Sequence, residues 1–97
     1  MVLVLIEHRQ GEVRDITYEM LEKANDLAPD LGSGVTGLLL SDNPSDFSEA
    51  LSPWVDELLI CESDRFENFN SDLYRQVVAD VIEDRKPSLV MIGQSSQ

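Results

Sequence analysis

Four short apolar runs alternate with segments of helical periodicity, and this alternation restricts the fold more than any other feature of the 97-residue chain. The runs are residues 2–6, 35–40, 57–61 and 89–92. They are apolar on both faces over most of their length, as strands are when helices cover both sides of a parallel sheet. We therefore predict that the four runs are strands of one parallel sheet.

Three segments that lie between the runs predict helices. Thr17 is a suitable N-cap for the first helix, and Pro29 and Gly32 bring this helix to an end. Its apolar face is predicted from the spacing of Tyr18, Leu21, Ala24 or Asn25, Ala28 and Leu31. Residues 46–51 predict a short second helix, closed by Pro53.

The third helix has the clearest pattern. Ser71 or Asp72 is predicted to cap its start, and Pro87 follows its end. Its buried stripe is predicted to consist of Tyr74, Val77, Val78, Val81 and Ile82. Charged residues occupy the opposite side, so the segment is amphipathic.

The predicted order of elements, βαβαβαβ, implies right-handed crossovers between parallel strands. The chain is thus predicted to be a single α/β domain over residues 1–97, a doubly wound three-layer sandwich with its four strands in the order 3-2-1-4. Such folds continue into another helix after the last strand, and residues 94–97 are too few to form one. We expect the domain to be incomplete at its C-terminal end, and its exposed fourth strand to promote self-association of the isolated chain.

Acidic residues outnumber basic residues by nineteen to seven, which gives a formal net charge of −12. Binding to nucleic acid or to anionic lipid is disfavoured, because both need local positive potential. The opening apolar run is too short to span a membrane and lacks the cationic flank of a signal peptide. Cys61 is the only cysteine. It is predicted to be a buried core residue in a reduced, cytoplasmic protein without internal disulfides.

Ligands of open parallel sheets bind beyond the carboxyl ends of the strands. The candidate ligand or subunit contacts in those places are Glu7, His8, Ser41, Asp42, Gly93, Ser95 and Ser96. The glycine after the fourth strand and the two hydroxyls that follow it could set backbone N–H groups against a phosphate. The three-glycine dinucleotide fingerprint and the P-loop do not occur, which excludes those two modes of binding.

The tripeptide Glu7-His8-Arg9 allows two interpretations. Because histidine titrates near neutral pH, His8 could act as a general base or contact a ligand. Alternatively, these side chains hydrogen-bond locally or across a subunit boundary. We favour the second interpretation, because the chain has one histidine and no nucleophile near it. No catalytic residue is predicted.

Two further groups of residues are predicted to be structural. The acidic residues at positions 62, 64, 67 and 72 lack the regular spacing of a calcium loop, so no metal site is predicted. The aromatic residues Trp54, Phe66 and Phe69 are predicted to pack in the core or between domains.

Residues 2–11, VLVLIEHRQG, resemble the opening of electron-transfer flavoprotein α subunits, in which an apolar strand runs into Glu-His, two residues and a glycine. Residues 13–19 and 23–32 are similar to the entry into the family's first helix and to its end, and residues 72–93 to its third helix and fourth strand. The β subunits share the fold but open with a different segment. Residues 53–56 depart from the Gly-Ala-Asp that the family usually has before its third strand. The resemblance covers essentially this whole chain and the first third of an α subunit.

The resemblance implies an N-terminal domain with a fold like that of the adenine-nucleotide α-hydrolases, which packs against the β subunit as a scaffold. It implies FAD in the C-terminal domain of the full-length α subunit, and AMP or a second FAD in the partner subunit. No cofactor is therefore expected in this chain. The implied role is that of an electron carrier component, not an enzyme, in a heterodimer that passes electrons from acyl-CoA or other dehydrogenases to an acceptor.

Two rival functions fit the same fold class. One is a free-standing adenine-nucleotide-binding module of the universal-stress type, which would use the loops after the first, second and fourth strands. The other is a small hydrolase or transferase, which would need a catalytic constellation. Binding of AMP or ATP by the isolated chain would favour the first rival over the flavoprotein.

Overall fold

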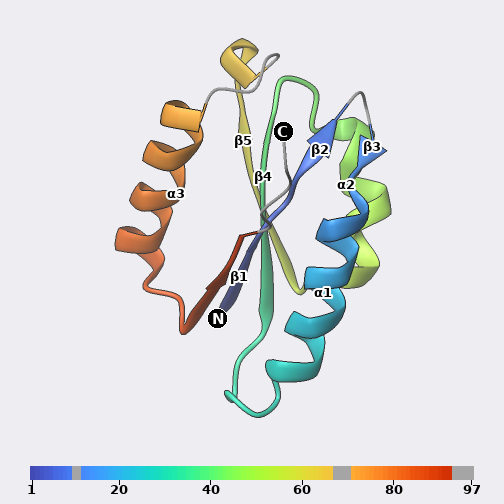
Figure 1. The fold of residues 1–97 in the computed structure, drawn as a ribbon, viewed down its shortest axis with the longest axis vertical. Coiled ribbons are helices and arrows are strands. Elements are labelled where there is room, and N and C mark those ends of the chain that lie inside the picture. The colour runs from blue at the N-terminus through green and yellow to red at the C-terminus, as the bar shows by residue number, and fades with distance from the viewer. Residues whose placement is uncertain (10–11, 67–70, 93–97) are drawn as a thin grey trace.

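The computed structural model describes residues 1–9, 12–66 and 71–92. Its centre is a parallel sheet in which the strands lie side by side in the order β5-β4-β1-β6 (Figure 1). In chain order these strands are β1 (Val2–Leu5), β4 (Val35–Ser41), β5 (Glu57–Glu62) and β6 (Leu89–Met91). The order 3-2-1-4 predicted for the four apolar runs is therefore confirmed.

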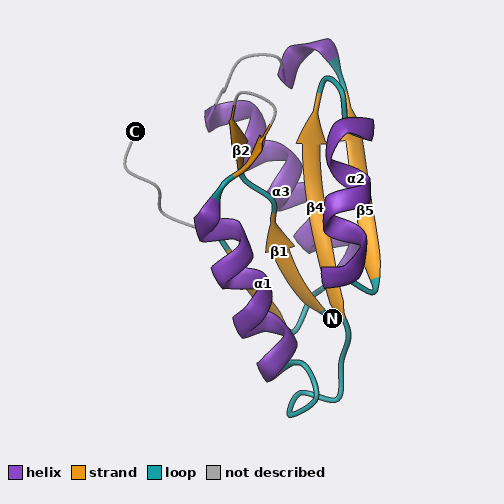
Figure 2. Ribbon diagram, turned by 90° about the vertical axis from the view of Figure 1, so that its right-hand side faces the viewer, coloured by secondary structure: helices purple, strands orange, loops and turns teal. Residues whose placement is uncertain are grey.

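Helices cover both faces of the sheet and make three layers (Figure 1). One face carries α1 (Asp15–Leu27) and α2 (Ser45–Leu51), which lie next to each other in Figure 2. The other face carries α3 (Ser71–Arg85). Single 3₁₀ turns, η1 (Ser52–Trp54) and η2 (Asp64–Phe66), lie just before and after β5. No helix in the described ranges is both long and apolar enough to cross a membrane.

The central strands β1 and β4 are buried along their whole length, because they have a strand on each side and helices on both faces. Side chains alternate between the faces, as the pleat requires. Val2, Val4 and Ile6 pack in the cluster beneath α1 and α2. Leu3 and Leu5 pack in the cluster beneath α3. This arrangement explains why the first run is apolar at every position.

The first helix differs from the prediction at its start. Arg14, not Thr17, is the N-cap residue, and the helix begins at Asp15. Thr17 lies in the first turn and is fully buried. Its hydroxyl accepts a hydrogen bond from the backbone N–H of Glu7 and donates one to the carbonyl of Glu7. The predicted N-cap role of Thr17 is therefore wrong, and its hydroxyl holds the loop after β1 instead.

The end of the first helix follows the prediction more closely. Gly32 has a φ of +62°, and the N–H of Ser33 reaches back to the carbonyl of Ala28 at 3.0 Å, which is the usual glycine-terminated helix end. Leu31, however, is 48% exposed, and Met20 is buried in the core instead. Leu31 is exposed because it lies in the turn after α1, past Leu27, the last residue of the helix that packs on the sheet.

Residues 7–13 are mostly polar and contain Gly11, a composition that predicts a loop. They include two short strands, β2 (His8–Arg9) and β3 (Glu12–Val13), which pair antiparallel with His8 opposite Val13. Two residues per strand are too few to show an alternating pattern, so the sequence carried no signal for them.

The third helix covers its face of the sheet loosely. Of the α3 side chains that the structure describes, Val78 is buried, whereas Tyr74, Val77 and Val81 are half-buried against the same cluster. Ile82 was predicted to lie in the buried stripe but is 37% exposed. Cys61 was also predicted to be fully buried and is half-buried. Both differences have the same cause: α3 is too narrow to cover the whole face of a four-stranded sheet, so side chains at its margins stay partly exposed.

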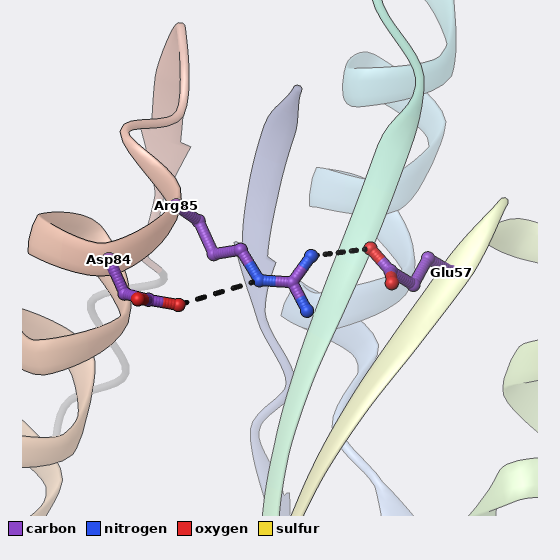
Figure 3. A network of polar contacts seen from close by, with 3 residues as sticks. All are labelled: Glu57, Asp84 and Arg85. Atoms are coloured by element: carbon purple, nitrogen blue, oxygen red, sulfur yellow. Dashed lines mark hydrogen bonds and ion pairs between the residues drawn. The ribbon is translucent and has the colours of Figure 1, made fainter.

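An ion pair joins the end of α3 to the start of the edge strand β5. The Nη1 atom of Arg85 lies 3.3 Å from Oε1 of Glu57, and its Nε lies 3.9 Å from Asp84 (Figure 3). These side chains are partly exposed, so solvent and salt screen the attraction.

Residues 53–56, which depart from the family pattern, connect the start of β5 to β4 and to α1. The carboxylate of Asp56 accepts a hydrogen bond from the N–H of Val35 at 2.8 Å, and the N–H of Asp56 donates to the carbonyl of Val35 at 2.8 Å. Asn25 donates to the carbonyl of Trp54 at 2.9 Å, and the Trp54 ring packs against Tyr18. Trp54 is thus a packing residue, as predicted. The side chains of Phe66 and Phe69 lie outside the description.

Candidate functional site

The carboxyl ends of the two central strands bring together the first four candidate residues. Glu7 and His8 follow β1, Ser41 ends β4, and Asp42 follows it. Because β1 and β4 are parallel neighbours, these residues share one edge of the sheet. The other candidates, Gly93, Ser95 and Ser96, lie outside the described residues.

His8 continues the hydrogen-bond ladder between β1 and β4 with its side chain. Backbone N–H groups of Val2 and Ile6 donate to the carbonyls of Gly34 and Leu38, an offset of 32 residues. The same offset would pair the backbone N–H of His8 with the carbonyl of Leu40. Instead, the Nε2 atom of His8 lies 2.7 Å from that carbonyl. A carbonyl can only accept, so Nε2 carries the hydrogen.

The imidazole of His8 is also held by packing. Its ring centroid lies 4.6 Å from that of Phe47, with the rings tilted by 35°. Phe47 comes from α2 and is buried in the core. The single histidine therefore connects the loop after β1 to β4 and to α2. This geometry supports local hydrogen bonding, which we favoured over general-base catalysis.

The backbone of Glu7 is clamped to the start of α1. Its N–H donates to the hydroxyl of Thr17 at 2.9 Å. Its carbonyl accepts from the same hydroxyl at 3.1 Å and from the N–H of Arg14 at 2.9 Å. These bonds fix the direction in which the chain leaves β1, and they use backbone groups that a bound phosphate would otherwise need.

Ser41 also has partners inside the protein. Its Oγ accepts from the N–H of Asn43 at 3.0 Å, and its carbonyl accepts from the N–H of Ser63. The hydroxyl of Ser45 donates to the Asn43 side chain. Ser41 is buried and Asp42 is exposed, so of these two candidates Asp42 is the one that faces solvent.

Tyr74 of α3 is a residue of this edge that sequence reasoning missed. Its hydroxyl points at the Leu40 carbonyl that also accepts from His8, at 3.4 Å. Burial raises the pKa of the Tyr74 hydroxyl, and the negative charges of Glu7 and Asp42 raise it further. The helical spacing placed Tyr74 in the buried stripe, but nothing in the spacing showed that its polar tip reaches the edge of the sheet.

The edge is acidic. Glu7, Asp42, Glu62 and Asp64 all follow or end strands β1, β4 and β5 at this side. This local negative potential disfavours a phosphate group. Within the parts of the chain described above, no group of three or more His, Cys, Asp or Glu side chains is arranged to hold a metal ion. The geometry supports a structural role, in which hydrogen bonds hold the ends of the strands to the neighbouring loops and helices.

The fold and its edge define a three-layer α/β domain in which the candidates Glu7, His8 and Ser41 hydrogen-bond within the domain. Residues 2–97 match the electron transfer flavoprotein domain. The chain therefore belongs to the electron transfer flavoprotein domain family.

Curated relatives support the same family. The chain is 33% identical over 93 residues to the electron transfer flavoprotein subunit alpha of Clostridium acetobutylicum, covering 95% of this chain and 28% of that protein. It is 30% identical over 96 residues to the subunit alpha of Bacillus subtilis, covering 98% and 29%. It is 25% identical over 96 residues to the acryloyl-CoA reductase electron transfer subunit beta of Anaerotignum propionicum, covering 98% and 26%. The resemblance to α subunits is confirmed, and the chain spans less than a third of the length of these relatives.

Proposed function

We propose that this chain is the N-terminal scaffold and subunit-assembly domain of an electron-transfer flavoprotein α subunit. The parent protein would form a heterodimer that passes electrons from flavin dehydrogenases to an acceptor. The observation that carries the proposal is the family match over residues 2–97, together with α-subunit relatives of which the chain covers about 28%.

The carboxyl-end edge supports a scaffold role over a cofactor site. Its hydroxyl and imidazole groups are engaged inside the domain, on Thr17, Ser41 and His8. Its carboxylates repel phosphate. The described residues therefore do not fit FAD or AMP. We propose that FAD binds the remainder of the full-length α subunit, and that AMP or a second FAD binds the partner subunit.

The proposed partners are a flavoprotein β subunit and, through the assembled complex, acyl-CoA or other dehydrogenases in the cytoplasm. Support comes from the names of two relatives. One is the acryloyl-CoA reductase electron transfer subunit beta, and the other is the lactate dehydrogenase (NAD(+),ferredoxin) subunit LctC of Acetobacterium woodii, 28% identical. We further propose that the isolated chain self-associates through the outer edge of β6.

The test is a deletion in the full-length protein. The α subunit is produced with its β subunit, with and without residues 1–97, and the dissociation constant of the heterodimer is measured by titration. We expect the deletion to weaken assembly by about tenfold or more, as loss of a large interface does, while the remaining α subunit keeps its flavin absorbance. Unchanged assembly would contradict the scaffold role.

The universal-stress type of nucleotide module is not favoured by the family match. It makes a separate prediction, since such a module binds AMP or ATP on its own. Calorimetric titration of the chain with either nucleotide is expected to give no saturable heat. Saturable binding that is lost in a Ser41→Ala variant, shown by circular dichroism to be folded, would revive that rival.

A further inference from the structure

The end of α1 presents two exposed leucines where a solvated helix would present polar side chains. Leu27 is 42% exposed and Leu31 is 48% exposed. The N–H of Leu31 donates to the carbonyl of Leu27 at 3.2 Å, so the two side chains lie one helical turn apart on the same side. The end of α1 lies at the end of the molecule where the strands begin, opposite the carboxyl-end edge (Figure 1).

Carboxylates lie on one side of this pair. Glu22, Asp26 and Asp30 are exposed on the same helix and the turn after it. With Asp15 and Glu19, they repeat at spacings of three and four over about 20 Å, which places them along one side of the helix. Lys23 is the one basic residue between positions 15 and 30. We refer to Glu22, Asp26, Leu27, Asp30 and Leu31 as the α1 end face.

The helix dipole adds to the negative potential at this place. The C-terminal end of a helix carries a partial negative charge, which basic side chains usually offset. The last turn of α1 contains no basic residue and contains Asp26 instead. The last turn of α3, by contrast, contains Arg85. The most negative end of α1 therefore coincides with its exposed leucines.

We propose that the α1 end face docks a protein partner with a lysine- and arginine-rich surface around a small apolar depression. Charge complementarity identifies the partner: cations would pair with the three carboxylates and the helix end, and the depression would take Leu27 and Leu31. Two leucines among three carboxylates make a small, polar patch. Obligate subunit interfaces are large and mainly apolar, so this face suits a transient, electrostatically steered complex.

The test uses the full-length protein together with its partner subunit, and a labelled 18-residue amphipathic peptide of lysine and leucine as the probe. Binding is followed by fluorescence anisotropy at 20 mM and at 150 mM salt. We expect binding that weakens with salt, because the Debye length shortens to about 8 Å at 150 mM. Absence of binding at 20 mM salt would overturn the proposal.

Matched variants distinguish binding at the α1 end face from non-specific attraction to an acidic protein. Glu22→Gln with Asp26→Asn and Asp30→Asn is expected to weaken binding about tenfold, as the loss of three partly screened charge pairs does. Asp80→Asn with Glu83→Gln and Asp84→Asn removes the same charge from exposed positions of α3, and is expected to weaken binding less than about twofold. Equal losses in the two variants would overturn the proposal.

Substitution of the two leucines gives a second test, which does not depend on charge. Leu27→Ala with Leu31→Ala is expected to weaken binding about fivefold at both salt concentrations, because loss of apolar contact is not screened. The control is Ile82→Ala, an exposed apolar residue on α3, which should leave affinity unchanged. Since the leucines are exposed, circular dichroism should show a folded variant. An unchanged affinity in the folded double variant would contradict the docking role of the leucines.

Discussion

The two faces of the sheet are covered very differently. Among the described residues, eleven buried hydrophobic residues form the cluster beneath α1 and α2, and five form the cluster beneath α3. The first face carries α1 and α2, whereas α3 is the helix that covers the second face (Figure 1). Stability is therefore concentrated in the β1-α1-β4-α2 half, and α3 is held by partly exposed contacts.

The largest expected effect is the loss of stability on truncating a buried residue of the first face, which we compare with truncation of a partly exposed residue of the second face. Leu21 of α1 is fully buried and Ile82 of α3 is partly exposed. Leu21→Ala should lower the free energy of unfolding by about 3 kcal/mol, because it leaves a cavity. Ile82→Ala should lower it by about 1 kcal/mol or less. Urea unfolding monitored by circular dichroism measures both values. Similar losses would mean that the two faces are equally packed.

A smaller effect tests how tightly the α1 and α2 face is packed. A Cβ at Gly37 would lie 3.1 Å from Leu58, 3.2 Å from Val55 and 3.3 Å from Ile6. Gly37→Ala should therefore cost about 1–2 kcal/mol of unfolding free energy through overpacking.

The control for this prediction is Gly32, where no atom lies within 4 Å of an added Cβ but φ is +62°. Gly32→Ala should cost about 1 kcal/mol through the backbone, and Gly32→Asn should cost less, because asparagine tolerates this conformation. Gly37→Asn should cost more than Gly37→Ala. Equal costs for alanine and asparagine at Gly37 would show that space is not limiting there.

Tyr74 connects the α3 face to the carboxyl-end edge, and its contribution should depend on pH. Its pKa is raised above the ordinary value of 10.0. The stabilisation that the neutral Tyr74 hydroxyl contributes is thus fully present below about pH 10. It is lost at higher pH, because this hydroxyl ionises at a lower pH in the unfolded chain than in the folded protein. Tyr74→Phe should lower stability at pH 7 by about 1 kcal/mol or less.

The measurement is the unfolding free energy of both proteins at pH 8 and pH 11. The wild-type protein should lose more stability between these values than Tyr74→Phe does. An equal loss would mean that the Tyr74 hydroxyl is as accessible in the folded protein as in the unfolded chain.

The smallest effect concerns the ion pair between α3 and β5 (Figure 3). Arg85→Gln should cost about 0.5 kcal/mol at low salt, since exposed pairs are weak, and almost nothing in 1 M salt, where screening is strong. Asp84→Asn serves as the control, because its oxygen lies farther from Arg85, at 3.9 Å. A salt-independent loss for Arg85→Gln would indicate a packing role for the arginine stem.

Much of the fold could be predicted because β1 is apolar at every position and β4 at most of its positions. The runs that became β1 and β4 have no other stable environment than a sheet covered on both faces. The buried helix positions of Leu21 and Val78 also follow from spacing alone. Spacing did not predict two exposed positions: Leu31 lies in the turn after α1, and Ile82 lies on the face that one helix covers incompletely.

The candidate site was located but its details could not be predicted. Topology alone places Glu7, His8, Ser41 and Asp42 at one edge. The role of Thr17 as a partner of Glu7, the bond from His8 to Leu40 and the reach of Tyr74 depend on side-chain geometry between segments distant in sequence. Hydrophobic periodicity carries no information about such contacts.

The most direct test of the central claim is the intact mass and absorbance of the native protein, purified from its source with an antibody against this chain. The account predicts a yellow complex, in which a subunit much heavier than 10.9 kDa contains these residues and a second chain accompanies it. A colourless 10.9 kDa species without a partner would contradict the proposed role in an electron-transfer flavoprotein.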